Sequence, residues 1–343
     1  MDGVVTPGVV LRGAVPRAVG LLSGGLDSTL AMRLMQEQGI EVHAVNFFTP
    51  FCNCNRAGRG CEAAHQGGRL GIPVKVLSLG RGYLRMVRNP PHGYGRAMNP
   101  CVDCRIMMYR AAAAYAARIG AAFLVTGEVV GQRPMSQRRE ALRTIDREAG
   151  VEGKVLRPLC ARLLSPTDPE LAGIVDRTVL GRIEGRGRRS QIDLAAAKGI
   201  ADYPCASGGC LLTEPLFARK LKDLFDHDPD PGIPEVNLLK IGRHFRLPCG
   251  LKLVVGRDER ENAVLEGWTA DLHLDVPLVP GPCGLGIGRA GEGDVPLACS
   301  IVARYSDAPR DVEASVRVRG REGEARTLCV RPASPRACDA ARV

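Results

Sequence analysis

Three short patterns in this sequence carry side chains that are suited to chemistry. The first, Ser23-Gly24-Gly25-Leu26-Asp27-Ser28, places paired glycines between hydroxyl groups and a carboxylate. The second is the pair Cys101 and Cys104, and the third is the later Cys210. Glycines let a backbone approach a ligand closely, and the free N–H groups at a helix start bind phosphate oxygens. The patterns therefore indicate phosphate binding combined with thiol chemistry.

The glycine loop stands where a strand is expected to pass into a helix. Residues 18–22 form a short apolar run, and residues 29–38 carry apolar side chains at helical spacing before Gly39. Thr29 adds a third hydroxyl group to those of Ser23 and Ser28. The loop contains no lysine, which excludes the G-x-x-x-x-G-K-[ST] type of ATP loop. The alternative interpretation is a glycine-rich turn without catalytic interest.

The spelling S-G-G-x-D-S resembles the PP-loop of the ATP pyrophosphatase superfamily. The resemblance implies an enzyme that binds ATP with Mg²⁺, adenylates a carbonyl or carboxyl oxygen and releases pyrophosphate. Asp27 is then expected to hold Mg²⁺ against the phosphates or to orient the attacked oxygen. The candidate nucleotide-binding residues are Ser23, Gly24, Gly25, Asp27, Ser28, Thr29 and Gly127.

The order of expected elements indicates the fold class. Strands alternate with helices through the first half of the chain, which predicts an α/β fold with a doubly wound, mostly parallel, Rossmann-like sheet. Ligands of such a sheet lie at the carboxyl ends of its strands. The loop at 128–137 follows an expected strand end and should face the nucleotide; an ordinary capped loop is the alternative. The expected strands are 41–48, 74–79 and 123–126, and the expected helices are 60–70, 105–119 and 167–175.

Composition shifts divide the remainder of the chain. We predict a PP-loop ATP-binding domain at 1–165 and a central region at 166–235 that is rich in Arg and Gly and bears cysteines. A smaller α+β domain at 236–331 and a loose tail at 332–343 complete the prediction.

The cysteine patterns resemble those of the tRNA 2-thiouridylase family (MnmA/TrmU type). The resemblance covers the loop at 23–28, Asn99-Pro100-Cys101-Val102-Asp103-Cys104, Thr126-Gly127 and Ser207-Gly208-Gly209-Cys210. It implies that a uracil carbonyl oxygen is adenylated and then replaced by sulfur. Cys210 would carry the sulfur as a persulfide, and Cys104 would release it by forming a disulfide. The chain departs from the family at Glu128-Val129, where His-Tyr is usual, and at Leu211, where Phe is usual.

Other roles for these cysteines stay open. Cys101, Cys104 and Cys210 could instead hold a [4Fe–4S] cluster with one iron free for sulfide. Cys205 competes with Cys210 for the later position, and buried thiols without a role are the plain alternative. Because Cys101 and Cys104 stand just before an expected helix, its dipole should lower their thiol pKa values.

A further cysteine set stands near residue 55. Cys52, Cys54, Cys61 and His65 are of the residue types that bind structural Zn²⁺, and free loop thiols are the alternative. Thirteen cysteines in a chain of 343 residues without a secretory pattern indicate reduced thiols and a cytoplasmic protein. No apolar run approaches the roughly 20 residues of a membrane span.

Charge and the C-terminal sequence both point to RNA. The net charge is +10 and the pI is about 9.1, which suits a polyanion, and tRNA is the natural partner for this superfamily. An Arg-rich composition without RNA binding is the alternative. Gly256-Arg257 followed by Asn262 resembles the G-R-x-x-x-x-N signature of the NFACT-R RNA-binding domain, with a plain hairpin as the alternative. Phosphate clamping is the candidate role of Arg182, Arg186, Arg188 and Arg189, unless they form a solvated basic loop.

Together these patterns predict an ATP-dependent tRNA uridine sulfurtransferase that forms AMP and pyrophosphate. Its expected partners are tRNA and a sulfur donor protein or sulfide, with no membrane. One rival is a PP-loop synthetase or sulfur-transfer enzyme that acts on a small molecule. The other rival is an RNA-binding protein without catalysis.

Overall fold

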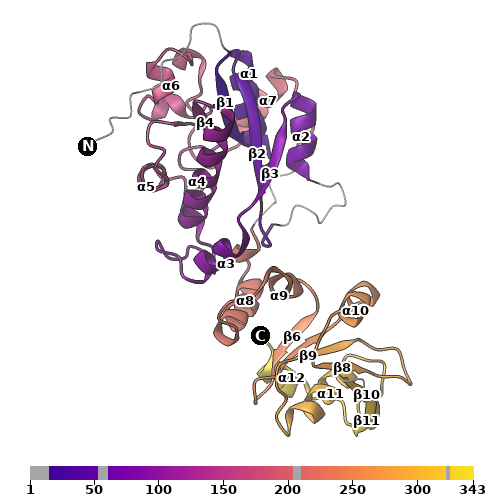
Figure 1. Cartoon of the computed structure of the whole chain (residues 1–343). Helices are drawn as coiled ribbons and strands as arrows, with labels where there is room; N and C mark the ends of the chain where they lie inside the picture. The colour runs from indigo at the N-terminus through magenta and orange to yellow at the C-terminus, as the bar shows by residue number, and fades with distance from the viewer. Residues whose placement is uncertain (1–14, 53–60, 204–209, 322–324) are drawn as a thin grey trace, which may run out of the picture. The chain divides into compact units, whose positions relative to one another are not determined.

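The computed structural model describes residues 15–52, 61–203, 210–321 and 325–343. The chain forms two compact units, Met1–Thr213 and Glu214–Val343 (Figure 1). This boundary divides the predicted central region, 166–235. Its earlier part packs into the N-terminal unit through Ala195, whereas Asp223 belongs to the C-terminal unit and pairs there with Arg246 and Lys252. The region therefore has no core of its own among the described residues.

A parallel sheet of five strands forms the centre of the N-terminal unit, in the order β3-β2-β1-β4-β5. Its central strand pairs in register on both sides, with Ala18 opposite Val42 and Phe123. The chain changes sides between β1 and β4, so the loops that follow these two strands meet at the carboxyl edge of the sheet. The strands are β1 (Arg17–Leu21), β2 (Glu41–Phe48), β3 (Val74–Ser78), β4 (Phe123–Thr126) and β5 (Val155–Leu156).

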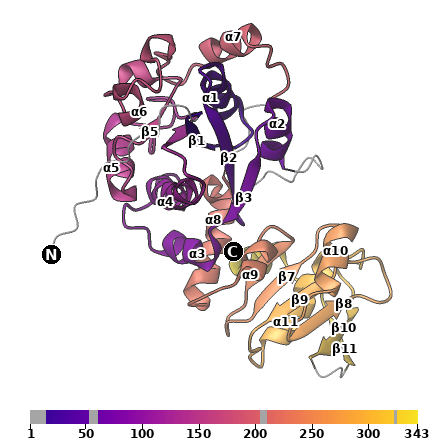
Figure 2. The ribbon, with the colours of Figure 1, turned by 45° about the horizontal axis from the view of Figure 1, so that its top comes forward.

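Helices cover both faces of this sheet, which confirms the predicted doubly wound fold (Figure 2). Side chains of β1 alternate between the faces: Ala18 packs with α1 and α7, whereas Val19 and Leu21 pack with α4 and α5. The helices are α1 (Leu26–Glu37), α2 (Glu62–Leu70), α3 (Gly80–Arg88), α4 (Cys101–Ile119), α5 (Arg139–Ala149), α6 (Asp168–Leu171) and α7 (Arg189–Ala197). Three short 3₁₀ turns belong to the same unit, η1 (Ala161–Leu163), η2 (Arg177–Val179) and η3 (Leu211–Thr213).

Two helices differ from their predicted bounds. The sequence predicts the long helix from Arg105, but α4 begins at Cys101, so Cys101 and Cys104 form its first turn. Pro100 is the N-cap residue, and its φ of −92° and ψ of 58° lie outside the helical region, so the helix starts only at Cys101. The helix predicted through residue 175 ends at Leu171, although its predicted start is confirmed by the Glu170 carboxylate, which accepts the Thr167 N–H at 2.7 Å.

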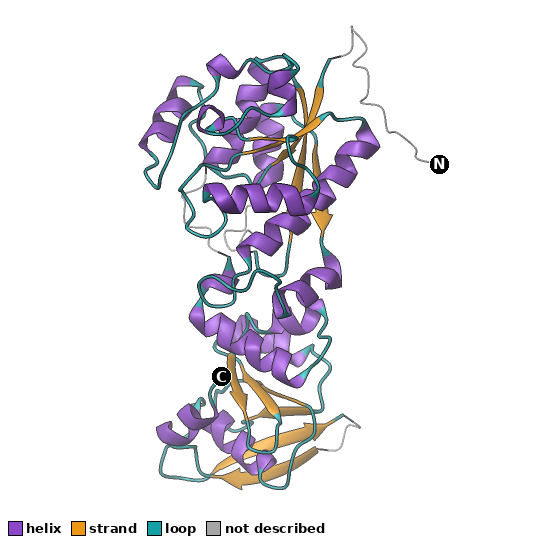
Figure 3. Ribbon diagram, turned by 90° about the vertical axis from the view of Figure 1, so that its left-hand side faces the viewer, coloured by secondary structure: helices purple, strands orange, loops and turns teal. Residues whose placement is uncertain are grey.

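The C-terminal unit contains an antiparallel sheet of six strands in the order β11-β10-β8-β9-β7-β6 (Figure 3). One face packs against α11 and α12, and the other carries Val254 and Leu285 against Leu265 of α10. The strands are β6 (Arg243–Arg246), β7 (Lys252–Val255), β8 (Leu272–Asp275), β9 (Gly284–Ile287), β10 (Ala314–Gly320) and β11 (Ala325–Val330). The helices are α8 (Pro215–His227), α9 (Ile233–Leu238), α10 (Glu259–Glu266), α11 (Asp294–Arg304) and α12 (Pro335–Ala341).

The predicted loose tail at 332–343 is wrong. Ser334 caps α12 by accepting the Ala337 N–H at 3.2 Å, and Cys338 is buried in the core of the C-terminal unit. The final residues therefore complete this unit. Across the described ranges, no helix combines the length and the apolar character that crossing a membrane requires.

Candidate active site

The glycine loop between β1 and α1, residues 23–29, is ordered by hydrogen bonds within itself. We call it the phosphate loop. The Ser23 and Ser28 hydroxyls lie 3.1 Å apart, and Ser28 Oγ also donates to the Gly25 carbonyl at 2.9 Å. The Thr29 hydroxyl donates to the same carbonyl at 3.1 Å. No side chain caps the start of α1, so its first N–H groups point toward the space beside the loop. Such a cradle suits phosphate oxygens.

Two glycines allow the close approaches that the loop requires. Gly24 has a φ of +82°, and a Cβ atom there would lie 2.6 Å from the Glu62 carbonyl carbon at the start of α2. Gly127 follows β4, and a Cβ atom there would lie 2.4 Å from the Ser28 nitrogen. Gly127 therefore lies directly against the phosphate loop, and its predicted contact with the nucleotide stays a prediction.

Asp27, in the first turn of α1, is held from two directions. Gln132, in the loop after β4, donates to Asp27 Oδ2 at 2.9 Å. Arg188 Nη2 lies 3.8 Å from Asp27 Oδ1. The stretch before Arg188 is joined to the same loop, because Gly185 donates to the Val130 carbonyl at 2.8 Å. Arg188 thus contacts the phosphate loop, whereas Arg182, Arg186 and Arg189 are exposed.

Glu128 does not face the phosphate loop; it is 1% exposed and lies in an ionic network inside the unit. Its carboxylate pairs with Arg157 Nε at 3.1 Å and Arg105 Nε at 3.3 Å, and it accepts the Tyr109 hydroxyl at 2.5 Å. Burial raises the pKa of this carboxyl, but the charges of Arg105 and Arg157 outweigh it and lower the pKa overall. Glu128 therefore links the end of β4 to α4, in which Arg105 follows Cys104.

The structure brings Cys210 close to the start of α4. Two hydrogen bonds fix the residues just after it: Leu211 N–H to the Phe51 carbonyl at 3.2 Å, and Met98 N–H to the Leu212 carbonyl at 3.0 Å. Met98 stands three residues before Cys101. In addition to desolvation, charge on the Cys104 and Cys101 thiols raises the pKa of Cys210, and charge on Cys101 raises the pKa of Cys104. We call these three residues the thiol group.

The thiol group and the phosphate loop lie at the same edge of the sheet. The phosphate loop follows the carboxyl end of β1, and Phe51 stands just beyond the carboxyl end of β2. Because α4 leads into β4, which is parallel to β1, the start of α4 also lies at this edge. The ring of Phe51 packs against Tyr83, with centroids 6.0 Å apart, and the Tyr83 hydroxyl lies 3.2 Å from Cys104 Sγ.

The expected lowering of the thiol pKa values is wrong for Cys104. Desolvation by the surrounding chain raises the pKa of Cys104 to about 11, although the Tyr83 hydroxyl and Arg105 oppose it. Desolvation likewise raises the pKa of Cys210 to about 12. The helix start is therefore too poorly hydrated for its dipole to determine the result. At rest, both thiols are protonated near neutral pH.

The described residues of the predicted metal sets do not surround a single metal ion. Within the ranges that the structure covers, no three or more His, Cys, Asp or Glu side chains are arranged to hold a metal ion. Cys61 Sγ lies 3.7 Å from Asn46 Oδ1, and His65 Nε2 lies 3.2 Å from Asp202. Cys54 and Cys205 lie outside the described residues, so the predictions for them stay predictions.

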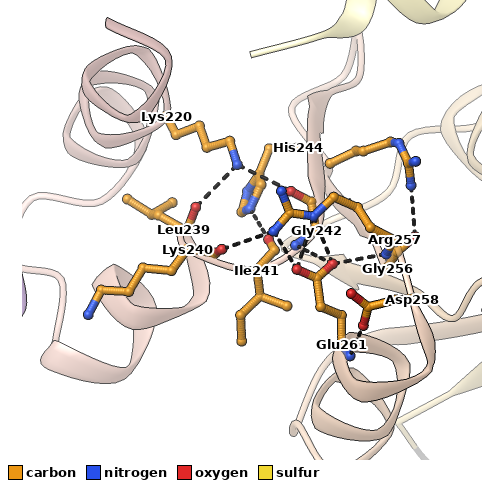
Figure 4. Close-up of polar contacts among 11 residues, drawn as sticks. Lys220, Leu239, Lys240, Ile241, Gly242, His244, Gly256, Arg257, Asp258 and Glu261 are labelled. Carbon is orange, nitrogen blue, oxygen red and sulfur yellow. Dashed lines mark hydrogen bonds and ion pairs between the residues drawn. The ribbon is translucent and has the colours of Figure 1, made fainter. Parts of the chain in front are cut away.

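In the C-terminal unit, the G-R-x-x-x-x-N residues build the turn between β7 and α10 (Figure 4). Arg257 Nε donates to Glu261 at 2.9 Å, and the same carboxylate accepts the Gly242 N–H at 3.1 Å. Asn262 Oδ1 accepts the Cys283 N–H at 3.0 Å, and a Cβ atom on Gly256 would lie only 2.0 Å from that oxygen. The Gly, Arg and Asn residues of the signature therefore stabilise the turn between β7 and α10.

A largely buried lysine, Lys220, lies next to this turn. Lys220 of α8 donates to the Leu239 and Gly242 carbonyls at 3.2 Å each (Figure 4). Burial lowers the pKa of Lys220 to about 8. This contact attaches α8 to the segment that enters β6, within the same unit.

Sequence reasoning misses three residues of the site. Gln132 stands within the loop predicted to face the nucleotide, but nothing in the sequence distinguishes it from its neighbours. The sequence groups Arg188 with three other arginines as an RNA clamp, and only the fold shows its contact with Asp27. Tyr83 lies in α3, a helix that the sequence patterns did not predict.

Comparisons with known proteins agree with the patterns read from the sequence. Residues 13–162 match the family of thiamine biosynthesis protein (ThiI), and residues 242–340 match the NFACT protein RNA binding domain. These matches confirm the predicted PP-loop and NFACT-R resemblances.

Two curated relatives match part of the chain. The tRNA-specific 2-thiouridylase MnmA of Acidithiobacillus ferrooxidans is 35% identical over 116 residues, which cover 32% of this chain and 33% of that protein. A probable tRNA sulfurtransferase of Caldanaerobacter subterraneus is 33% identical over 147 residues, which cover 42% of this chain and 36% of that protein. The chain thus spans about a third of the length of these relatives.

Among solved structures, a 4-thiouridine synthetase–RNA complex with bound ATP overlaps with a TM-score of 0.34 at 20% identity. The overlap covers 66% of this chain and 52% of that chain.

Proposed function

We propose that this protein is an ATP-dependent tRNA sulfurtransferase that thiolates a uridine. One observation carries the proposal: the phosphate loop with Asp27 and the thiol group with Cys104 and Cys210 share the carboxyl edge of one parallel sheet. A site that both activates a carbonyl oxygen and replaces it with sulfur needs these two functions within reach of one base. The similarity of part of the chain to a tRNA-specific 2-thiouridylase and to a probable tRNA sulfurtransferase supports the same activity.

The phosphate loop is suited to binding ATP. The N–H groups at the start of α1, with the hydroxyls of Ser23, Ser28 and Thr29, would receive the phosphates. Asp27 Oδ1 is buried, and among the described residues no donor forms a hydrogen bond with it. A carboxylate oxygen of this kind fits Mg²⁺, which prefers oxygen ligands. Bound there, Mg²⁺ would neutralise charge as pyrophosphate leaves.

The sulfur chemistry assigns different tasks to the two cysteines. The uracil carbonyl oxygen is a poor leaving group, and transfer of AMP to it makes it a good one. The terminal sulfur of a Cys210 persulfide then attacks that ring carbon, and AMP leaves. Cys104 next attacks Cys210 Sγ, which forms a Cys104–Cys210 disulfide and leaves the sulfur on the base. A sulfur donor must supply each persulfide, and a dithiol reductant must restore the thiols.

The raised pKa of the Cys210 thiol fits this order of events. A protonated Cys210 is a weak nucleophile, so the empty enzyme would not attack an activated base. A persulfide is more acidic than the thiol that carries it. Loading sulfur onto Cys210 would therefore create the nucleophile.

Within the described residues, neither Cys101, Cys104 and Cys210 nor Cys52, Cys61 and His65 are arranged around a single metal ion. A [4Fe–4S] cluster, in which each cysteine binds a different iron atom, stays a prediction for Cys101, Cys104 and Cys210. We derive no step through a cluster or a zinc ion.

The C-terminal unit would supply a second contact with tRNA. Its match to the NFACT protein RNA binding domain and the net charge of +10 support this role.

The direct test is mass spectrometry of tRNA nucleosides from a strain that lacks this protein. We expect one thiolated uridine to disappear and to return with the wild-type gene but not with Asp27→Asn. Unchanged thiolated nucleosides in the deletion strain would contradict the proposal, and pyrophosphate release without tRNA would favour a small-molecule substrate.

A further inference from the structure

The loop between α3 and α4 lies beside both segments that carry the thiol group. We call residues 89–100 the linking loop. It leads directly into α4, whose first turn contains two of the three cysteines. Its Met98 N–H donates to the Leu212 carbonyl at 3.0 Å, and Leu212 follows the third cysteine, Cys210, by two residues. The placement of the three cysteines relative to one another therefore depends on how this loop is held.

The linking loop has a strained backbone. Ala97 has a φ of +56°, a value that residues other than glycine rarely adopt. Its neighbours hold it there, because the Gly95 N–H donates to the Asn99 carbonyl at 2.9 Å across it. Strain of this kind persists only where the surrounding structure fixes the backbone, and it clusters at functional sites. The loop is therefore held in place by its contacts rather than by its own conformational preference.

His92 attaches the linking loop to the first turn of α4. Its Nδ1 lies 2.8 Å from Asp103 Oδ1, and its backbone N–H donates to Asp103 Oδ2 at 3.1 Å. Asp103 is 4% exposed and stands between Cys101 and Cys104 in the sequence. Because both carboxylate oxygens bind His92, the first turn of α4 and the linking loop are held as one piece.

The second ring nitrogen of His92 contacts α5. Its Nε2 lies 3.1 Å from Glu148 Oε1, and Arg110 of α4 donates to the Glu148 carbonyl at 2.6 Å. The Glu148 contact thus repeats a connection between α4 and α5 that the structure already makes through Arg110. The contact with Asp103, in contrast, acts directly on the turn that carries the cysteines.

We propose that His92 is a positioning residue that holds the first turn of α4, so that Cys104 and Cys210 can form a bond with each other. The inference rests on the proposed function, because these are the two cysteines assigned to sulfur transfer. A disulfide forms only when its two Cα atoms lie about 4–7 Å apart and the side chains point toward each other. Loss of the Asp103 contact would free the first turn of α4 to move, and would leave the sheet and the phosphate loop in place.

Two amide variants separate the ring contacts of His92. In His92→Asn the side-chain N–H lies near the place of Nδ1, so it keeps the Asp103 contact and loses Glu148. In His92→Gln the amide reaches farther, to the place of Nε2, so it keeps Glu148 and loses the side-chain contact with Asp103. The control is His43→Gln, since His43 binds Glu41 at 2.7 Å and its side chain is 24% exposed, close to the 28% of His92.

The first measurement uses the full chain without tRNA or ATP. Each variant is equilibrated with mixtures of reduced and oxidised dithiothreitol, and peptide mass spectrometry measures the Cys104–Cys210 disulfide. We expect His92→Gln to lower the equilibrium constant of this disulfide at least about tenfold, because the thiols are misplaced. His92→Asn and His43→Gln should stay within about threefold of wild type on the same scale.

The second measurement is a single turnover with persulfide-loaded enzyme, ATP and tRNA. His92→Gln should slow sulfur transfer at least about tenfold, whereas ATP binding and adenylation should stay within about twofold of wild type. A residue that only stabilises the fold would not divide the two steps in this way.

An equilibrium constant of the disulfide in His92→Gln equal to that of wild type would overturn the inference while leaving the proposed function intact. Equal losses in the two amide variants would overturn it as well, because the Asp103 contact would then not be the cause. A wild-type chain that forms the disulfide but transfers no sulfur to tRNA would instead contradict the proposed function, and the inference with it.

Discussion

The phosphate loop and the thiol group lie at one edge of one sheet, but the structure prepares them in different ways. In the phosphate loop, hydroxyls are tied to one another and to the Gly25 carbonyl, so the cradle has its shape before a ligand arrives. In the thiol group, desolvation raises the pKa of Cys104 to about 11 and of Cys210 to about 12. Under the proposed function, the phosphate loop would bind ATP without rearrangement, whereas the thiol group would first need to be loaded with sulfur.

The largest expected effect is a variant that abolishes sulfur transfer but leaves nucleotide activation intact. Cys210→Ser should lower thiolation by at least about 10³-fold, because serine cannot carry a persulfide. ATP binding and tRNA-dependent pyrophosphate release should continue. Single-turnover assays with radiolabelled ATP and tRNA measure both steps, with Cys249→Ser, an exposed cysteine of the other unit, as the control. Normal thiolation by Cys210→Ser would show that another cysteine, such as Cys205, carries the sulfur.

The variant with the opposite expected effect, slower adenylation with unchanged thiols, is Asp27→Asn. It should slow adenylation by about 10²-fold, because the carboxylate that would hold Mg²⁺ is lost. The alkylation rates of Cys104 and Cys210 should not change, since Asp27 has no contact with either thiol in the described structure. Mass spectrometry of alkylated peptides gives these rates. An altered thiol reactivity in this variant would mean that the phosphate loop and the thiol group depend on each other for their structure.

Glu128 is a buried residue between the phosphate loop and the thiol group. It follows Gly127, which lies against the phosphate loop, and it pairs with Arg105, which follows Cys104. Glu128→Gln should lower the free energy of unfolding by about 2 kcal/mol, because two buried guanidinium groups lose their charged partner. Since the folded-state pKa of Glu128 is lowered, this stabilisation is present above its unfolded pKa and is lost as the pH falls through the folded value.

Its matched control is Glu170→Gln, another buried carboxylate, which pairs with Arg177 at 2.6 Å away from the phosphate loop. Both variants should melt earlier, but only Glu128→Gln should speed alkylation of Cys104, because it loosens the first turn of α4. Equal alkylation rates in the two variants would reduce Glu128 to a stabilising role.

The smallest effect concerns pH. Alkylation of Cys104 should rise about tenfold per pH unit from pH 7 to 10, because its thiolate fraction grows until the pH reaches its raised pKa. A thiol with the ordinary value of 9.0 would level off earlier. Quenched alkylation series followed by peptide mass spectrometry measure the profile. A plateau below pH 9 would contradict the desolvation of this thiol.

Structural elements that depend on local sequence were predictable. The strand at 41–48, the one at 123–126 and the phosphate loop follow from apolar periodicity and from glycines between hydroxyl groups. The pairing of Cys104 with Cys210 came from a family resemblance, and the structure brings the two segments together.

Features that depend on the environment were not predictable. The raised pKa values of Cys104 and Cys210 follow from desolvation by burial, and a sequence does not give burial. The contact of Arg188 with Asp27 joins residues 161 positions apart. The C-terminal helix α12 has start signals in Ser334 and Pro335 that our sequence prediction overlooked, and Cys338 packs into the core.

The central claim is that nucleotide activation and sulfur transfer occur at one site. The most direct measurement loads the protein with radioactive sulfur as a persulfide, then adds tRNA with or without ATP in a single turnover. We predict that label moves into a tRNA nucleoside only with ATP, with one AMP formed for each sulfur transferred. Label that stays on the protein in the presence of ATP, or that moves without it, would contradict the claim.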